Sequence, residues 1–549
     1  MITKSAKIIV LVSLYLLVTL ACNPSSANVP APPAEQSPIE ATASQPNTPT
    51  PTLAPSSTPS PFPTPTPTES PLPVPTEIIP VLELDNLDLH RQAMLPDFAD
   101  DVDAVAKAGA SRYYLEVELE PDSLDGEGGV KLSGRERVQY TNTENETLSE
   151  IYFRLYPNLP AYGGQMTVEV VTIDGQLVEP ALEAEDSALR VPLSQLLASG
   201  EVIDISLTYT ILVPVETLFG YNILIYEDDT VTLSGFYPTI AMYDEEGWDV
   251  KVPPYYGDAP YLDVALYQVQ LTVPEEMVVA ASGSLLDSAS NDDGTKTLSL
   301  VSGPIREFYI AMREDYEVTS ETIDGVTVNS YYPPRIENGG KAALRYAVDS
   351  LRVFNERFGP YPYAEFDVVA TPTTAGGIEY PGIVVVNQQL YEFEGAFFQQ
   401  AVVHEVIHQW WYGVVGNNQI DEPWLDEALT SYSTIFYWED VAGAKMAGKI
   451  IESYFLNPYE KATENGEDRA VVGPVGDFSE REYSIFVYGK GPLFFNALRQ
   501  KVGNDVYLEI MQTYYTKYKY KMADGDDLLT LVERISGQDV DPLFEKWMQ

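Results

Sequence analysis

The stretch His404-Glu405-Val406-Ile407-His408 lies inside an apolar segment and fixes the character of the C-terminal half of the chain. Residues 397–411 contain neither Gly nor Pro, which predicts a largely buried helix. Residues four positions apart lie on one face of a helix, so both imidazoles can reach one ion. Glu405 lies about 100° further round the helix. Its carboxylate is therefore expected beside that ion and not as a ligand.

A third metal ligand is expected from the next helical segment. Trp424-Leu425-Asp426-Glu427 has the composition of a helix start, and Glu427 follows His408 by nineteen residues. Catalytic zinc takes three protein ligands and keeps one position for water or substrate. Two neutral imidazoles and one carboxylate suit Zn²⁺ better than Mg²⁺ or Ca²⁺, which prefer oxygen ligands. We therefore predict one Zn²⁺ per chain, held by His404, His408 and Glu427, with Glu405 as the catalytic base.

The alternative interpretation of this motif is a pair of core histidines on a buried helix. A His-Glu-x-x-His stretch also occurs by chance, so the motif alone does not exclude it. The chain has only three histidines, however, and the remaining one is His90. Unpaired imidazoles in apolar surroundings would also cost desolvation energy. Both observations favour the metal site.

Length and charge limit the class of protein. The chain has 549 residues, which indicates two or more folded domains. Asp and Glu total 82 against 32 Lys and Arg, giving a formal net charge of −50. Binding to nucleic acid needs clustered cations, so nucleic acid is excluded as a partner. A soluble acidic surface is expected instead.

The hydrophobic pattern changes period along the chain. From about residue 110 to 320 apolar and polar residues alternate, as in Ile203, Ile205 and Leu207, which predicts an antiparallel β-rich domain over 85–320. After about residue 335 the period becomes helical, and Gly359-Pro360 ends the first helix. Mixed strands and helices follow, so an α+β domain is expected over 321–549.

The N-terminus has the features of an exported protein. Lys4 and Lys7 precede a short apolar run, and residues 1–21 are interpreted as a signal peptide. Thr19-Leu20-Ala21-Cys22 resembles a bacterial lipobox, in which the cysteine is acylated. Residues 22–84, rich in Pro, Thr and Ser, are predicted to be a disordered spacer. We expect a cell-surface lipoprotein anchored to the membrane through Cys22. An ordinary cleaved signal with an incidental Cys22, and hence a secreted protein, is the alternative.

Three motifs together resemble the aminopeptidase N family of gluzincin metallopeptidases, which includes leukotriene hydrolase. The zinc motif is followed after eighteen residues by Glu427, although Asp426 stands where the family commonly has Asn. Gly376-Gly377-Ile378-Glu379-Tyr380 looks like the family's exopeptidase motif, Gly-x-Met-Glu-Asn, with departures at Ile378 and Tyr380. Tyr488-Gly489-Lys490-Gly491, sixty-one residues beyond Glu427, looks like the motif that carries the family's catalytic tyrosine.

The resemblance implies a fold and a set of roles. The fold would be a saddle-like antiparallel β-domain followed by a thermolysin-like α+β catalytic domain. The activity would be that of a zinc aminopeptidase acting on peptides with a free N-terminus. Glu379 would bind the α-amino group, Gly376 and Gly377 would let the backbone approach the substrate, and Tyr488 would donate a hydrogen bond to the oxyanion. The sequence ends soon after this domain, so the C-terminal helical domain of larger members would be missing and the site more open.

Two other functions stay open at this stage. The same metal site would serve a zinc endopeptidase or another hydrolase. Glu379 distinguishes an aminopeptidase from these enzymes, because an enzyme that binds the free α-amino group at Glu379 should not cleave N-acetylated peptides. A protein of another class, a non-catalytic zinc-stabilised surface binding lipoprotein, would not need Glu405.

Overall fold

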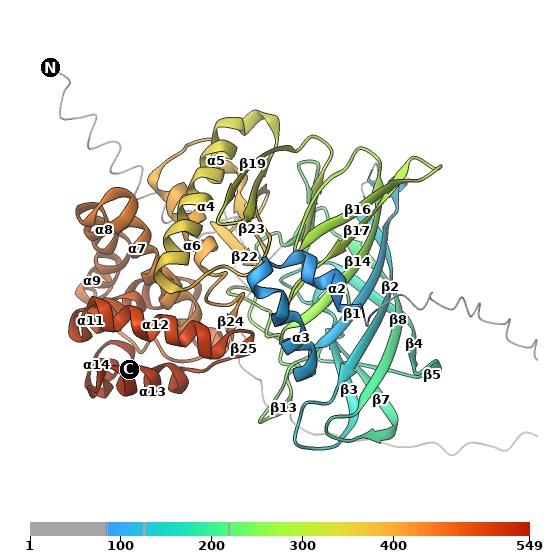
Figure 1. The fold of residues 1–549 in the computed structure, drawn as a ribbon, viewed down its shortest axis with the longest axis horizontal. Helices are drawn as coiled ribbons and strands as arrows, with labels where there is room; N and C mark the ends of the chain where they lie inside the picture. Colours follow the sequence, from blue (N-terminus) through green and yellow to red (C-terminus); the bar gives the residue numbers. More distant parts are fainter. Residues whose placement is uncertain (1–83, 85, 125–127, 218–219) are drawn as a thin grey trace, which may run out of the picture. The chain divides into compact units, whose positions relative to one another are not determined.

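The computed structural model describes residues 84, 86–124, 128–217 and 220–549. The predicted signal peptide, the lipobox-like Cys22 and all but the last residue of the predicted spacer lie outside the described residues. The described chain begins with short helical segments and continues into sheets, followed by a helix-rich C-terminal half (Figure 1). The first segments are α2 (Leu87–His90), two 3-10 turns (Arg91–Ala93 and Pro96–Phe98) and α3 (Ala99–Ala108).

The N-terminal half is built on an eight-stranded sheet, which confirms the β-rich expectation. Burial alternates along β2, as it must when one face of a sheet covers the core. All neighbours are antiparallel except β1 and β14, which pair in parallel. In sheet order the strands are β16 (Ser284–Ser290), β17 (Thr295–Val301), β14 (Ala265–Pro274), β1 (Ser111–Leu119), β2 (Val130–Thr141), β8 (Val202–Val213), β4 (Gln165–Ile173) and β5 (Gln176–Val178).

Two four-stranded sheets and a short hairpin complete this half. The first sheet has the order β15 (Val278–Ala281), β18 (Ile310–Arg313), β10 (Thr230–Leu233) and β9 (Leu224–Glu227). The second has the order β11 (Thr239–Ile240), β3 (Leu148–Arg154), β7 (Ala188–Leu197) and β6 (Ala181–Glu183). The hairpin pairs β12 (Tyr243–Asp244) with β13 (Gly247–Trp248).

The C-terminal half begins with a mixed five-stranded sheet, which confirms its α+β character. The sheet order is β19 (Glu317–Ile323), β20 (Val326–Tyr332), β21 (Glu365–Thr371), β23 (Ile383–Asn387) and β22 (Gly377–Tyr380). The boundary expected between residues 320 and 321 therefore falls inside β19, whose pairing with β20 places it in this half. The edge strand β22 is antiparallel to β23 and carries the exopeptidase-like motif.

Helices make up the rest of this half. The predicted first helix is α4 (Glu337–Phe358), and it ends at Gly359 as expected. None of the helices in the described residues combines the length and apolar character needed to cross a bilayer. The other helices, with two strands, are α5 (Gln388–Tyr391), α6 (Ala396–Ile407), β24 (Val415–Gly416), α7 (Leu429–Ala442), α8 (Ala444–Ile450), α9 (Asn457–Glu464), α10 (Glu480–Glu482), α11 (Gly491–Val502), α12 (Asn504–Tyr518), β25 (Lys521–Met522), α13 (Gly525–Ser536) and α14 (Asp541–Met548).

A buried arginine links the β-rich half to the C-terminal half. Arg306 is 1% exposed, and its guanidinium donates to the backbone oxygens of Tyr412 at 2.8 Å and Lys521 at 3.0 Å. A Cβ atom at Gly416 would lie 2.1 Å from Cζ of Arg306, so this close approach requires glycine. The contact joins the loop before β18 to the segment that follows α6.

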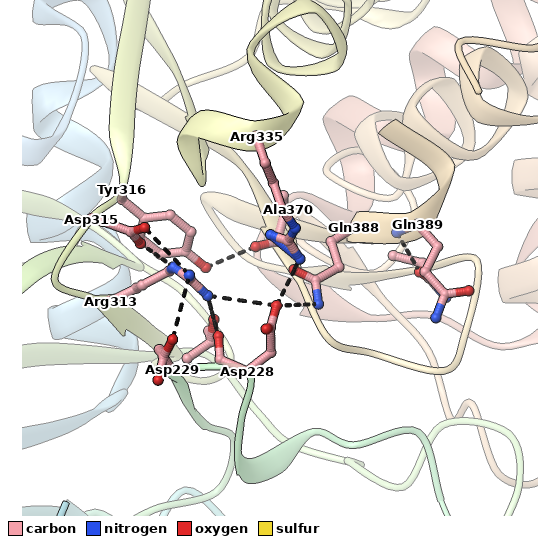
Figure 2. Close-up of polar contacts among 11 residues, drawn as sticks. Asp228, Asp229, Arg313, Asp315, Tyr316, Arg335, Ala370, Gln388 and Gln389 are labelled. Carbon is pink, nitrogen blue, oxygen red and sulfur yellow. Dashed lines mark hydrogen bonds and ion pairs between the residues drawn. The ribbon is translucent and has the colours of Figure 1, made fainter. Parts of the chain in front are cut away.

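A second link involves the turn between β9 and β10. Figure 2 shows the carboxylate of Asp228 accepting from Arg335 at 2.7 Å and from the side-chain amide of Gln388 at 3.1 Å. Beside it, the hydroxyl of Tyr316 donates to the backbone oxygen of Ala370 at 2.8 Å. The contacts of Asp228 with Arg335 and Gln388 therefore link the β-rich half to the C-terminal half.

Candidate metal centre

The two motif histidines lie at the C-terminal end of α6. The helix has an apolar run of buried residues, and His408 caps its C-terminus with helical backbone angles. The Nε2 atoms of His404 and His408 are 3.2 Å apart, and their ring centroids are 4.8 Å apart. The spacing of four residues thus directs both imidazoles to one point, as predicted.

Glu427 reaches the same point from the next element. It lies in a π-helical turn, Trp424–Ala428, that leads into α7. Its Oε2 is 3.0 Å from Nε2 of His404 and 3.5 Å from Nε2 of His408. Ligands bound to zinc at ~2.0–2.1 Å in a tetrahedron are ~3.3 Å apart. The three donor atoms have this spacing, so the residues present fit one Zn²⁺.

The second ring nitrogen of His408 is held by Asp426. The Nδ1 atom lies 3.1 Å from Oδ1 of Asp426 and 3.1 Å from the backbone oxygen of Trp411. Donation from Nδ1–H to these acceptors leaves Nε2 free to ligate a metal. Burial lowers the pKa of His408, but the nearby carboxylates of Glu379, Asp426 and Glu427 outweigh it and raise the pKa.

Three acids lie shortly before Glu427 in the sequence, Asp421, Glu422 and Asp426, and the geometry brings Asp426 to a motif histidine. Asp421 instead accepts from the side chain of Asn418 at 3.0 Å. Glu422 accepts from the backbone of Gly525 at 3.1 Å. Asp426, which is fully buried, is the acid that contacts the imidazole. The third histidine, His90, is a core residue whose Nδ1 lies 2.7 Å from the backbone oxygen of Ser302.

Glu405 is positioned by the edge strand β22. A Cβ atom on Gly377 would lie 2.4–2.6 Å from Cγ, Cδ and Oε1 of the Glu405 side chain. Only glycine at this position lets the carboxylate lie against the strand. Burial, followed by the charge of Glu379, raises the pKa of Glu405 well above its usual range. The residue predicted as the base is thus 5% exposed and held against backbone.

Tyr488 lies beside the zinc ligands on a second π-helical turn, Tyr483–Lys490. Its ring centroid is 5.9 Å from that of His404. Burial and the adjacent Glu427 carboxylate raise the pKa of the phenol, so it stays a hydrogen-bond donor at neutral pH. A Cβ atom on Gly491 would lie 2.5 Å from Cβ of Ala428, which explains why the tyrosine motif carries glycine. π-helical turns are frequent at functional sites.

Glu379 lies on β22 at the edge of a cavity. The carboxylate is 5% exposed and accepts from Nε2 of Gln419 at 3.2 Å. The cavity has a volume of about 30 Å³, and Asp258, Glu307 and Tyr412 also line it. Burial, with the charge of Asp258 next, raises the pKa of Glu379 well above its usual range. Gly376 has more room, since a Cβ atom there would lie 3.7 Å from its nearest neighbour.

Two residues at this cavity were not predicted from the sequence. Carboxylate oxygens of Asp258, Glu379, Asp426 and Glu427 lie within 4.8 Å of one another. Asp258 belongs to a loop of the β-rich half, and Gln419 belongs to the loop between β24 and the turn that carries Glu427. Neither loop has a periodic pattern. The Gly257-Asp258 pair, with a positive φ at Gly257, is the only local signal.

Comparisons with known proteins identify a peptidase domain in the C-terminal half. Residues 342–547 match the Peptidase family M1 domain. Aminopeptidase 2 of Candida albicans is 24% identical over 51% of this chain and 32% of its own length. Leucyl aminopeptidase of Saccharolobus solfataricus is 22% identical over 44% of this chain and 32% of its own length. This chain therefore spans about a third of the length of the curated relatives that it matches.

A solved structure extends the similarity to both halves. The M1 zinc metallopeptidase from Deinococcus radiodurans matches with a TM-score of 0.62 at 21% identity, covering 80% of this chain and 93% of that protein. At this identity the match shows the shared fold. The matched model, the ligand geometry and the shared fold lead to one conclusion: residues 342–547 are a Peptidase family M1 domain, as the resemblance to the aminopeptidase N family of zinc metallopeptidases implies.

Proposed function

We propose that this chain is a zinc-dependent aminopeptidase that removes N-terminal residues from peptides. The observation that carries the proposal is the position of two carboxylates beside one metal site. Glu405 lies on the zinc helix against β22, and Glu379 lies two residues beyond Gly377 on the same strand. A base and an amine-binding group are therefore held at a fixed spacing by one strand.

Each side chain has a role that follows from its surroundings. Zinc, when bound by His404, His408 and Glu427, supplies a Lewis acid that polarises the scissile carbonyl and activates water. Glu405 accepts the proton of the attacking water and passes it to the leaving amine. Tyr488 donates a hydrogen bond to the oxyanion that develops on the carbonyl.

Glu379 gives the site its preference for a chain end. A buried carboxylate surrounded by other acids is stabilised by a cation, and a peptide's free α-ammonium group is such a cation. Binding there places the first peptide bond next to the metal. Peptides whose N-terminus is blocked would lose this interaction, which separates an aminopeptidase from an endopeptidase on the same metal site.

The test is hydrolysis of aminoacyl fluorogenic amides by the purified zinc-loaded chain. We expect cleavage of the free amide, no cleavage of its N-acetyl derivative, and a fall in kcat of about 10²-fold or more in Glu405→Gln. Cleavage of the N-acetyl derivative would favour an endopeptidase. If the wild type retains zinc and cleaves neither compound, a zinc-stabilised binding protein becomes the better explanation.

We also propose that the protein is exported and anchored to a membrane by acylation of Cys22. The support is the basic start, apolar run and lipobox-like tetrapeptide of residues 1–22, followed by the Pro- and Thr-rich residues up to 84. Labelling of expressing bacteria with a fatty-acid probe should mark the wild type and not Cys22→Ala. Equal recovery of both proteins in the soluble fraction would favour secretion without an anchor.

A further inference from the structure

Gln419 lines the cavity, and only the nitrogen of its side-chain amide is hydrogen-bonded among the described residues. The side chain is 2% exposed, and its Nε2 donates to Oε1 of Glu379 at 3.2 Å and to Oδ2 of Asp426 at 2.6 Å. Its carbonyl oxygen, Oε1, has no hydrogen-bond partner among the described residues. Buried side-chain oxygens are nearly always bonded, so this acceptor is suited to a donor from outside the protein.

The two carboxylates fix which way the amide of Gln419 points. If the amide were turned over, its oxygen would face the oxygens of both Glu379 and Asp426, and acceptor would meet acceptor. The nitrogen therefore faces the acids and the carbonyl is left unpaired. In this orientation the amide donates to both Glu379 and Asp426.

The charge around this acceptor selects a cation. The residues that line the cavity include Asp258, Glu307 and Glu379 and no Lys, Arg or His. Of the four carboxylates within 4.8 Å of one another, Asp426 is bonded to His408 and Gln419, and Glu427 belongs to the metal site. The acceptors left for a ligand are Asp258, Glu379 and Oε1 of Gln419.

We propose that Gln419 is a substrate-binding residue that accepts a hydrogen bond from the α-ammonium group of the peptide, beside Glu379 and Asp258. Three acceptors match the three N–H donors of a primary ammonium. The same side chain joins the amine site to the metal site, because its amide holds Glu379 and also Asp426, the partner of His408. This inference rests on the proposed aminopeptidase function and names the chemistry of its amine site.

The other ligand with suitable chemistry is a second divalent cation. Two carboxylates and a carbonyl oxygen also suit Ca²⁺ or Mg²⁺. Ca²⁺ takes about 6–8 oxygen ligands, however, and a second divalent ion here would lie beside zinc. We therefore assign the ammonium group, and the metal content of the protein tests that choice.

The experiment compares the binding of two ligands to a variant that lacks the catalytic base and therefore does not hydrolyse them. Zinc-loaded Glu405→Gln is titrated by calorimetry with L-alanyl-L-alanine amide and with its N-methyl derivative, whose secondary ammonium has one donor fewer. We expect the primary amine to bind about tenfold more tightly. With Gln419→Met added, binding of the primary amine should weaken about tenfold and the preference over the N-methyl compound should shrink to about twofold or less.

The matched control is Gln400→Met in the same background. Gln400 is also a buried glutamine, but its amide is bonded to Thr434 and Trp438 and does not line the cavity. This variant should keep the tenfold preference. An unchanged preference in Gln419→Met would overturn the proposal, as would two metal equivalents per chain after dialysis against Ca²⁺ and Mg²⁺. Because no turnover is measured, loss of the amine preference stays distinguishable from failure of the proposed activity.

Discussion

Oδ1 of Asp426 lies 3.1 Å from Nδ1 of His408, and the neighbouring residue Glu427 places its own oxygen 3.5 Å from Nε2 of the same ring. Consecutive residues of one π-helical turn therefore contact opposite nitrogens of one imidazole. Such a turn has one residue more than an α-helical turn, which alters the directions in which neighbouring side chains point. The turn thus supplies both a metal ligand and the group that orients another ligand.

Replacing Asp426 should weaken zinc binding. In Asp426→Ala the ring of His408 loses its carboxylate acceptor, and zinc affinity is expected to fall about 10–100-fold. Asp426→Asn should be milder, because the amide oxygen can still accept from Nδ1–H. Competition with a chelator measures the affinity. Asp421→Ala is the control, since that acid contacts Asn418 and not a histidine. Equal affinities in Asp426→Ala and Asp421→Ala would contradict the assignment.

Gly377→Ala should damage the base and spare the metal site. The added Cβ would lie 2.4 Å from Cγ of Glu405, so the carboxylate must move. A displacement of about 1 Å in a catalytic group costs about 10²-fold in rate, and we expect kcat to fall by about that factor with zinc content unchanged. Gly376→Ala is the control, because the same substitution at the preceding residue would place a Cβ 3.7 Å from its nearest neighbour, which is an ordinary contact. A similar kcat in both variants would show that Gly377 does not position Glu405.

Tyr488→Phe should lower kcat by about 10²–10³-fold with little change in KM, because the lost donor acts on the oxyanion and not on the bound peptide. Steady-state kinetics on an aminoacyl amide gives both constants. Tyr483→Phe is the control. Its ring is 5.6 Å from that of Tyr488, and its hydroxyl has no hydrogen-bond partner among the described residues. An equal fall in kcat in both variants would argue for a packing role.

The parts of the site that the sequence predicted are those with a local pattern. His404 and His408 are related by helical spacing alone, and Glu427 follows on the next helical segment. The position of Glu379 beside the metal was available only through a resemblance, since a short Gly-rich stretch has no periodicity of its own. The prediction of a helix start around Glu427 was correct in place, but its π-helical geometry has no signal in the sequence.

The parts that the sequence missed depend on contacts between distant segments. The carboxylate of Asp258 comes from the β-rich half and lies beside Glu427, and the amide of Gln419 donates to Glu379 and Asp426, which are not its neighbours in sequence. The parallel pairing of β1 with β14 likewise joins residues about 150 positions apart. Alternation predicts that a strand has a buried face, but it does not name the partner strand.

Burial of Glu307 predicts a measurable pH dependence of stability. Burial raises its pKa to about 7 from an ordinary value of 4.5, so the folded state holds a proton that the unfolded state has lost. This contribution to the free energy of unfolding is about 3 kcal/mol. It is present below about pH 4.5 and is lost as the pH rises through 7.

Glu307→Gln keeps an oxygen for the Tyr412 hydroxyl and cannot ionise. In urea unfolding with chelator present, the variant should gain about 2–3 kcal/mol on the wild type between about pH 5 and about pH 8. Exposed Glu276→Gln should gain nothing, and a pH-independent difference for Glu307→Gln would contradict the assignment.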